Sequence, residues 1–254
     1  MPLPQLRGAV RGCLLGLGLA ASLPAGDLVV SAAASLSEAF QELGRRHEAR
    51  HPGTRVVFNT GASDKLLQQI LAGAPADVFA AADQAAMDKA VAQKAVDPAT
   101  RATFAGNALV MIVPADLRGP APAAPADLLK PAVRRVAVAN PASVPAGRYT
   151  REALAALGLW TALEAKAVFA QSVRQCLDYV ARGEVEAGFV YATDAAVQAA
   201  RVKVAAPVPT RTPVTYPIAV VAGTRRAQAA QAFVALVCSP EGREVLARFG
   251  FRKP

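Results

Sequence analysis

Histidine is nearly absent from this chain. Only two histidines, His47 and His51, occur among 254 residues. Enzymes that need several histidine ligands, or a histidine base beside a serine nucleophile, are therefore nearly excluded. Aromatic residues make up only 6% of the chain, and its charges are scattered without a basic run of five. The excess of 28 Lys and Arg over 19 Asp and Glu therefore does not indicate nucleic-acid binding.

Long apolar runs are also lacking beyond the first 26 residues, which excludes a polytopic membrane protein. Residues 1–26 combine a basic start at Arg7 and Arg11 with an apolar, glycine-rich run and a small residue, Ala25, that suits cleavage. This pattern is typical of a secretory signal peptide and unlike a lipoprotein signal or a buried helix. We therefore expect export to the periplasm.

Cysteine is scarce as well. Cleavage of the signal peptide would leave only Cys176 and Cys238, in an oxidising compartment where they could form a disulfide. Both lie on apolar faces of predicted helices, which favours small buried hydrophobic side chains over a disulfide.

One short motif suggests a metal site. His47 to His51 form the pattern H-E-x-x-H, which occurs on the zinc-binding helix of metalloproteases. A catalytic zinc needs a third protein ligand, and the chain has no third histidine. A Pro-Gly pair follows at once, and neighbouring arginines predict a solvated basic helix face. A secreted zinc hydrolase that uses His47 and His51 remains as the alternative from a different class of protein.

The remaining chain alternates apolar strand-like runs with amphipathic helices. This alternation predicts α/β architecture, with mainly parallel sheets flanked by helices on both faces. Strands are expected at 28–32, 54–60, 77–81, 108–113, 135–140, 166–170, 187–192, 201–206 and 216–223. Helices are expected at 36–51, 65–72, 84–94, 149–157, 173–182, 227–238 and 241–249.

Two long strands, at 105–113 and 214–222, are the expected crossing points between two domains. We predict a discontinuous first lobe of residues 27–106 plus 212–254, with residues 107–211 inserted as the second lobe. Ligands of α/β sheets bind beyond the carboxyl ends of the strands, often between domains. Function is therefore sought in the strand-to-helix turns.

Four of those turns predict anion binding. Ser35 with Glu38 forms an S-x-x-E capping box, and Ser63 is placed as another helix N-cap. The other two turns are at 144–147 and 171–173. Each turn exposes free backbone N–H groups at a helix N-terminus, which is a ready site for a tetrahedral oxyanion without any formal positive charge.

Several stretches of the chain match a known pattern. They are AAASL (32–36), GASDKLLQQI (61–70), GAPADVFAAADQAAMDKA (73–90), GNALVMIVP (106–114), VPAGRYTREAL (144–154), VYATDA (190–195) and YPIAVV (216–221). With these stretches, residues 27–251 resemble the periplasmic molybdate-binding proteins, which are the solute receptors of molybdate ABC transporters. AAASL and GAPADVF together are the most specific part of the resemblance.

The resemblance implies a type II periplasmic binding protein fold with two lobes around a ligand cleft. It implies a monomeric, non-catalytic receptor without a cofactor, which binds molybdate and also tungstate and delivers it to an ABC permease. Carried over by position, the ligand contacts fall on Ser35, Ser63, Ala146, Val173 and Tyr191. The serines and Tyr191 would donate from hydroxyl groups, while Ala146 and Val173 would donate from backbone N–H groups.

Two positions depart from the family pattern. Asn140 stands where an acidic residue is common, and Asp64 stands where a small or hydroxyl residue is usual. A carboxylate at that turn would repel a dianion if it pointed inward, so we expect Asp64 to point to solvent. Another tetrahedral oxyanion, such as sulfate, is the alternative ligand.

Overall fold

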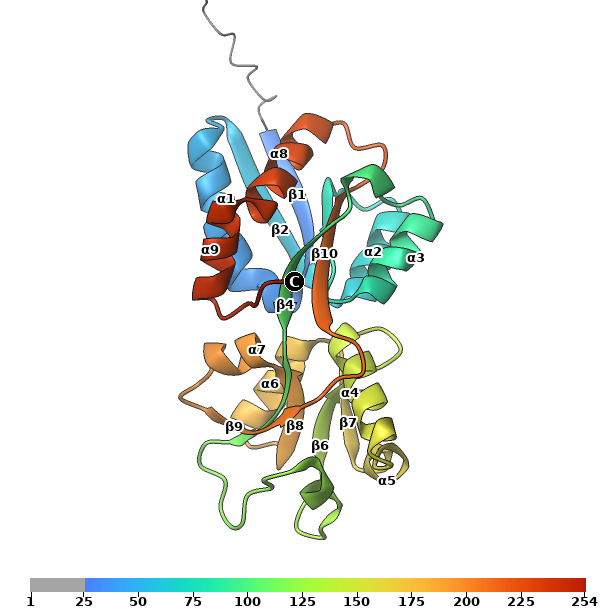
Figure 1. The fold of residues 1–254 in the computed structure, drawn as a ribbon, viewed down its shortest axis with the longest axis vertical. Coiled ribbons are helices and arrows are strands. Elements are labelled where there is room, and N and C mark those ends of the chain that lie inside the picture. Colours follow the sequence, from blue (N-terminus) through green and yellow to red (C-terminus); the bar gives the residue numbers. More distant parts are fainter. Residues whose placement is uncertain (1–25) are drawn as a thin grey trace, which may run out of the picture.

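Two five-stranded sheets, one in each half of the molecule, organise the fold (Figure 1). The computed structural model describes residues 26–254, so the predicted signal peptide lies outside the described residues except for its last position. The first sheet has the strand order β2-β1-β3-β10-β4 and the second has the order β7-β6-β8-β5-β9. Helices flank both sheets.

Both sheets are mixed. In the first, β1 pairs in parallel with β2 and β3, while β10 runs antiparallel to β3 and β4. In the second, β6 pairs in parallel with β7 and β8, while β5 runs antiparallel to β8 and β9. The strands of the first sheet are β1 (Gly26–Ala33), β2 (Thr54–Gly61), β3 (Val78–Ala80), β4 (Ala102–Asn107) and β10 (Val214–Val220). Those of the second are β5 (Leu109–Pro114), β6 (Val136–Ala139), β7 (Ala167–Ala170), β8 (Ala187–Tyr191) and β9 (Val202–Val208).

The expected alternation of strands and helices is confirmed, with differences at particular helices. The helices are α1 (Ser37–Arg50), α2 (Ser63–Leu71), α3 (Gln84–Ala92), α4 (Pro145–Ala156), α5 (Trp160–Glu164), α6 (Val173–Ala181), α7 (Ala192–Val197), α8 (Ala227–Cys238) and α9 (Pro240–Arg248), with short 3₁₀ turns at Ala34–Leu36, Pro98–Thr100 and Pro125–Leu129. Helix α4 begins at Pro145 and not near residue 149, because proline is well suited to the first helical position. The short helices α5 and α7 were not expected.

The chain passes between the two sheets twice. It leaves β4 at Asn107 and enters β5 at Leu109, and it returns between β9 and β10 through residues 209–213. The C-terminal segment lies against the first passage, where Gly106 and Arg252 exchange two backbone hydrogen bonds of 2.8 and 2.9 Å. A Cβ at Gly106 would come within 2.8 Å of the Lys253 carbonyl oxygen, so this close approach favours glycine.

Both cysteines of the described residues, Cys176 and Cys238, are free, as their apolar surroundings indicated. Cys176 is fully buried in α6, and the half-buried Cys238 ends α8 in the other half of the molecule. Among residues 26–254, no helix combines the length and the apolar character that crossing a membrane requires.

His47 differs from the expectation. It is 1% exposed, and its ring packs edge-on against Phe233 with ring centroids 5.6 Å apart. The prediction of a solvated basic face is wrong for this residue, because His47 follows Phe40 and Leu43 on the buried stripe of α1 at helical spacing. Burial lowers the pKa of His47 from 6.5 to about 4, with smaller contributions from His51 and Arg50.

This buried imidazole makes stability depend on pH. Between pH 6.5 and about 4 the unfolded chain binds a proton at His47 that the folded chain does not, so His47 lowers the stability as the pH falls. In urea unfolding, His47→Leu should therefore gain stability relative to the wild type as pH falls from 7 to 4, by as much as about 3 kcal/mol. His51→Leu, at the C-cap that directly follows the same helix, is the matched control. If His47→Leu and the wild type lost the same unfolding free energy between pH 7 and 4, this assignment would be contradicted.

Candidate functional site

A small cavity lies at the carboxyl ends of the parallel strands, between the two halves of the molecule. The empty space within it is about 220 Å³. Its wall consists of neutral residues from both halves, all of them small or medium-sized except Tyr191: Ala33, Ala34, Ser35, Gly61, Ala62, Ser63, Ala82, Val144, Pro145, Ala146, Val173 and Tyr191. All five residues singled out from the sequence are among them.

The first half contributes two buried serine hydroxyls. Ser35 lies in the 3₁₀ turn between β1 and α1, and Ser63 is the first residue of α2, directly after β2. Neither serine caps its helix, so both capping predictions are wrong. Each hydroxyl instead contacts a residue that is distant in the sequence. Ser35 Oγ lies 3.1 Å from Tyr216 Oη, and Ser63 Oγ accepts a 3.1 Å hydrogen bond from the Ala82 N–H. Because Ser63 accepts from the protein, its proton is free to donate into the cavity.

The second half contributes two helix N-termini. Ala146 is the second residue of α4, and Val173 is the first residue of α6, whose N-cap Ser172 accepts from Gln175 N–H. The first N–H groups of a helix have no acceptor within it and carry partial positive charge. Gly147 lets α4 begin so close to β6, because a Cβ there would lie 2.0 Å from the Ala139 carbonyl oxygen.

Tyr191 ends β8 at the floor of the cavity. Its phenol is 1% exposed and donates a long hydrogen bond of 3.4 Å to the Ala82 carbonyl oxygen in the other half. Burial raises the pKa of Tyr191 well above its usual value near 10, so the phenol keeps its proton throughout the physiological range. Tyr191 is thus a further neutral hydroxyl beside the cavity, and its single proton is directed at the Ala82 carbonyl oxygen.

One arginine beside the cavity bridges the two halves. Arg148, in the first turns of α4, lies 2.7 Å from a carboxylate oxygen of Asp64 and 2.7 Å from one of Asp83, which belong to the first half. The side chain of Asp64 is only 9% exposed and also pairs with Lys89 at 2.6 Å. The expectation that Asp64 points to solvent is therefore wrong: it faces cations, which offset its repulsion of an anion.

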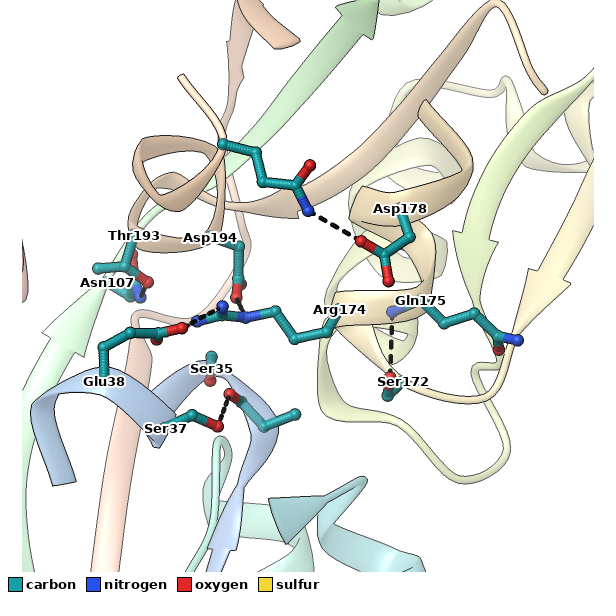
Figure 2. Close-up of polar contacts among 12 residues, drawn as sticks. Ser35, Ser37, Glu38, Asn107, Ser172, Arg174, Gln175, Asp178, Thr193 and Asp194 are labelled. Atoms are coloured by element: carbon teal, nitrogen blue, oxygen red, sulfur yellow. Dashed lines mark hydrogen bonds and ion pairs between the residues drawn. The ribbon is translucent and has the colours of Figure 1, made fainter. Parts of the chain in front are cut away.

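A second arginine lies directly after Val173. Arg174 binds both carboxylate oxygens of Glu38 on α1, at 2.7 and 2.6 Å, and its Nε donates to Asp194 at 2.6 Å (Figure 2). Two carboxylates thus hold the guanidinium away from the cavity wall. Burial raises the pKa of Asp194 to about 6, although Arg174 opposes that shift.

The wall therefore has donors from both halves and no charged side chain among the residues that line it. Such a wall suits an anion that accepts hydrogen bonds at every oxygen. His47 and His51 border a separate hollow near α8 and α9, together with Arg50 and Glu241. Within the described range 26–254, no cluster of three or more His, Cys, Asp or Glu residues could hold a metal ion.

Sequence reasoning missed the arginine bridges and two residues behind the cavity, Asn107 and Tyr216. Arg148 and Arg174 could have been noticed, because each follows a proposed contact by one or two residues in the same helical turn. Tyr216 gave no such signal, since it lies 181 residues from Ser35 in the chain.

The fold and the cavity define the class, which is a two-lobed solute-binding protein of the type II periplasmic fold. Residues 28–252 match the family model for bacterial extracellular solute-binding proteins. The molybdate-binding protein ModA of Escherichia coli is 41% identical over 233 residues, and the match covers 89% of each chain. ModA of Haemophilus influenzae is 33% identical over 254 residues, with 93% of each chain covered. The solved periplasmic molybdate-binding protein of Azotobacter vinelandii is 27% identical, with a TM-score of 0.76 and coverage of 89% of this chain and 99% of that one.

The chain belongs to the bacterial extracellular solute-binding proteins and, among them, to the ModA molybdate-binding family. Members of this class are transport receptors and not enzymes, so the zinc-hydrolase alternative is wrong.

The Arg174–Asp194 pair gives a pH-dependent test. Arg174→Met leaves the buried Asp194 carboxylate without its cation, which should cost about 3 kcal/mol of unfolding free energy at pH 8. Because the pKa of Asp194 is already about 6 and rises further in the variant, the acid is neutral at pH 5. The cost should therefore fall at pH 5 to what the lost pair with Glu38 contributes. Urea unfolding at both pH values measures this difference.

The double variant Arg174→Met/Asp194→Asn is the matched control, because it carries no buried acid. Its stability relative to the wild type should vary less between pH 5 and 8 than that of the single variant. A single variant with the same loss at both pH values would contradict the assigned pairing.

Proposed function

We propose that this protein is a periplasmic receptor that binds one molybdate ion, or tungstate at the same site, and delivers it to an ABC permease. The observation that carries the proposal is the cavity walled by neutral residues of both halves, among which lie hydroxyl and backbone N–H donors. It occurs in a chain that is 41% identical to a protein named for molybdate binding.

Five residues form the proposed ligand shell. Ser35 and Ser63 donate from their hydroxyls, and Ala146 and Val173 donate from backbone N–H groups. Tyr191 donates from its phenol, whose proton turns from the Ala82 carbonyl oxygen to the ion. The helix N-termini add partial positive charge where the oxygens of the ion lie. The ion therefore keeps both negative charges, because each oxygen exchanges water for a protein donor.

The same wall discriminates among oxyanions. Phosphate near neutral pH retains a proton, and a shell made only of donors gives that proton no acceptor. Sulfate is fully ionised but smaller, so donors on opposite walls cannot all reach it. Molybdate and tungstate are nearly equal in size, and both meet the full shell.

Binding also fits a closing motion. We propose that residues 27–106 plus 212–254 form one lobe and residues 107–211 the other, with hinges near Gly106–Asn107 and Pro207–Pro213. Only the closed form brings both sets of donors to one ion, so the ion binds that form more tightly. The pairs of Arg148 and Arg174 with first-lobe carboxylates span the closed cleft.

Residues 1–26 are the proposed export signal, which directs the receptor to the periplasm. We propose that the receptor is a monomer there.

Calorimetric titration tests the ligand. The purified chain should bind one molybdate per protein, tungstate should compete for the same site, and sulfate and phosphate should give no saturable heat at comparable concentrations. A stoichiometry of two, or no heat with either metal oxyanion, would contradict the proposal. Saturable sulfate binding without molybdate binding would favour the alternative ligand.

Ser63→Ala tests the donor shell. The variant removes a hydroxyl that faces a charged acceptor, which should cost about 1.5–3 kcal/mol, or roughly tenfold to 150-fold in molybdate affinity. Ser37→Ala is the matched control, because the Ser37 hydroxyl donates to the Ala34 carbonyl at 2.7 Å and does not line the cavity. If Ser63→Ala and the wild type bound molybdate with equal affinity, Ser63 would not be a ligand contact.

A further inference from the structure

A chain of polar side chains runs behind the cavity wall, outside the proposed ligand shell. Asn107 Nδ2 lies 2.9 Å from Thr193 Oγ1 and 3.2 Å from Tyr216 Oη, and Tyr216 Oη lies 3.1 Å from Ser35 Oγ. All four residues are at least nine-tenths buried. Figure 2 shows Asn107 beside Thr193, at the passage between the halves. These hydrogen bonds connect Asn107, at the passage between the two halves, to one residue of the cavity wall, Ser35.

The direction of these hydrogen bonds is fixed at one end by the backbone. The Ala108 N–H donates to Asn107 Oδ1 at 2.8 Å, and an N–H can only donate. The other atom of the Asn107 amide must therefore be its NH₂ group, which has two protons and no acceptor capacity. One proton serves Thr193, and the other is donated to the Tyr216 oxygen.

The direction of the bond from Asn107 also determines which atom donates between Tyr216 and Ser35. Its oxygen accepts from Asn107, and burial raises the pKa of Tyr216 well above its usual value, so the phenol keeps its own proton. The only other hydrogen-bond partner of Tyr216 Oη within the described chain is Ser35 Oγ. Three aromatic rings, those of Tyr191, Phe104 and Phe251, pack edge-on around the phenol at centroid distances of 5.4–6.3 Å and hold it in place.

A serine hydroxyl that accepts on one side has its proton free on the other. We propose that Asn107 and Tyr216 are positioning residues that fix the Ser35 hydroxyl as a donor into the cavity, an inference that rests on the proposed oxyanion function. Without them, no donor among the described residues lies behind the Ser35 hydroxyl, and the direction of its proton is no longer fixed. The polarity of this wall residue is thus set by side chains that never touch the ligand. Ser63 accepts its hydrogen bond from a backbone N–H instead, so both serine hydroxyls accept from the protein and donate into the cavity.

A double-mutant cycle tests the inference, with molybdate affinity measured by calorimetry. Tyr216→Phe keeps the packed ring and removes the hydroxyl, and it should weaken molybdate binding by about two- to tenfold. In a Ser35→Ala background the same substitution should change the affinity by less than about twofold, because the hydroxyl that Tyr216 directs is gone. Packing damage alone would lower the affinity equally in both backgrounds.

Tyr149→Phe is the matched control, since this buried phenol bonds the Pro213 carbonyl and does not contact Ser35. It should leave the affinity unchanged in both backgrounds. Asn107→Ala is an independent test and should weaken molybdate binding only where Ser35 is present. It decides the question alone if Tyr216→Phe does not fold.

Unchanged affinity in both arms, or equal losses with and without Ser35, would overturn the inference. Failure of the proposed function has a different signature, because the wild-type chain would then give no heat with molybdate.

Discussion

A doubly charged ion must be held in a cavity whose wall has no charge of its own, and this constraint organises the structure. Neutral donors act over short distances, so several must meet at one point, and a single helix N-terminus cannot surround an ion. The two sheets solve this by aiming their strand-to-helix turns at each other. Proline at the start of α4 and glycine at position 147 allow its N-terminus to approach the end of β6.

The cations near the site support this arrangement without entering it. Arg148 and Arg174 each lie within one or two residues of a proposed backbone donor, yet each is bound by two carboxylates. A free guanidinium on the wall would bind any anion strongly and would weaken discrimination. Placed between the halves, the same guanidiniums instead pair with carboxylates of the first half. Their pairing also explains how Asp64 can lie beside an anion site.

The sequence was most informative where local rules decide the structure. Alternating apolar runs predicted the strands of both sheets and the helices that flank them, because strand burial depends mainly on local pattern. They did not predict the antiparallel pairs of β10 and β5, because strand direction depends on the long-range connections. The capping assignments for Ser35 and Ser63 were wrong, because Tyr216 and the Ala82 N–H bind those hydroxyls across the fold. Family resemblance, and not residue chemistry, pointed to Tyr191. Asn107 was missed because nothing in the sequence reveals which way a buried amide faces.

The central claim is that the ion is held by donors that do not titrate near neutral pH. Its most direct test is the molybdate dissociation constant measured from pH 6.5 to 9. The phenols of Tyr191 and Tyr216 keep their protons throughout this range, and the backbone donors carry no titratable group, so the affinity should stay nearly constant. A steep loss of affinity above pH 7 would reveal a titrating cation in the site and would contradict recognition by neutral donors.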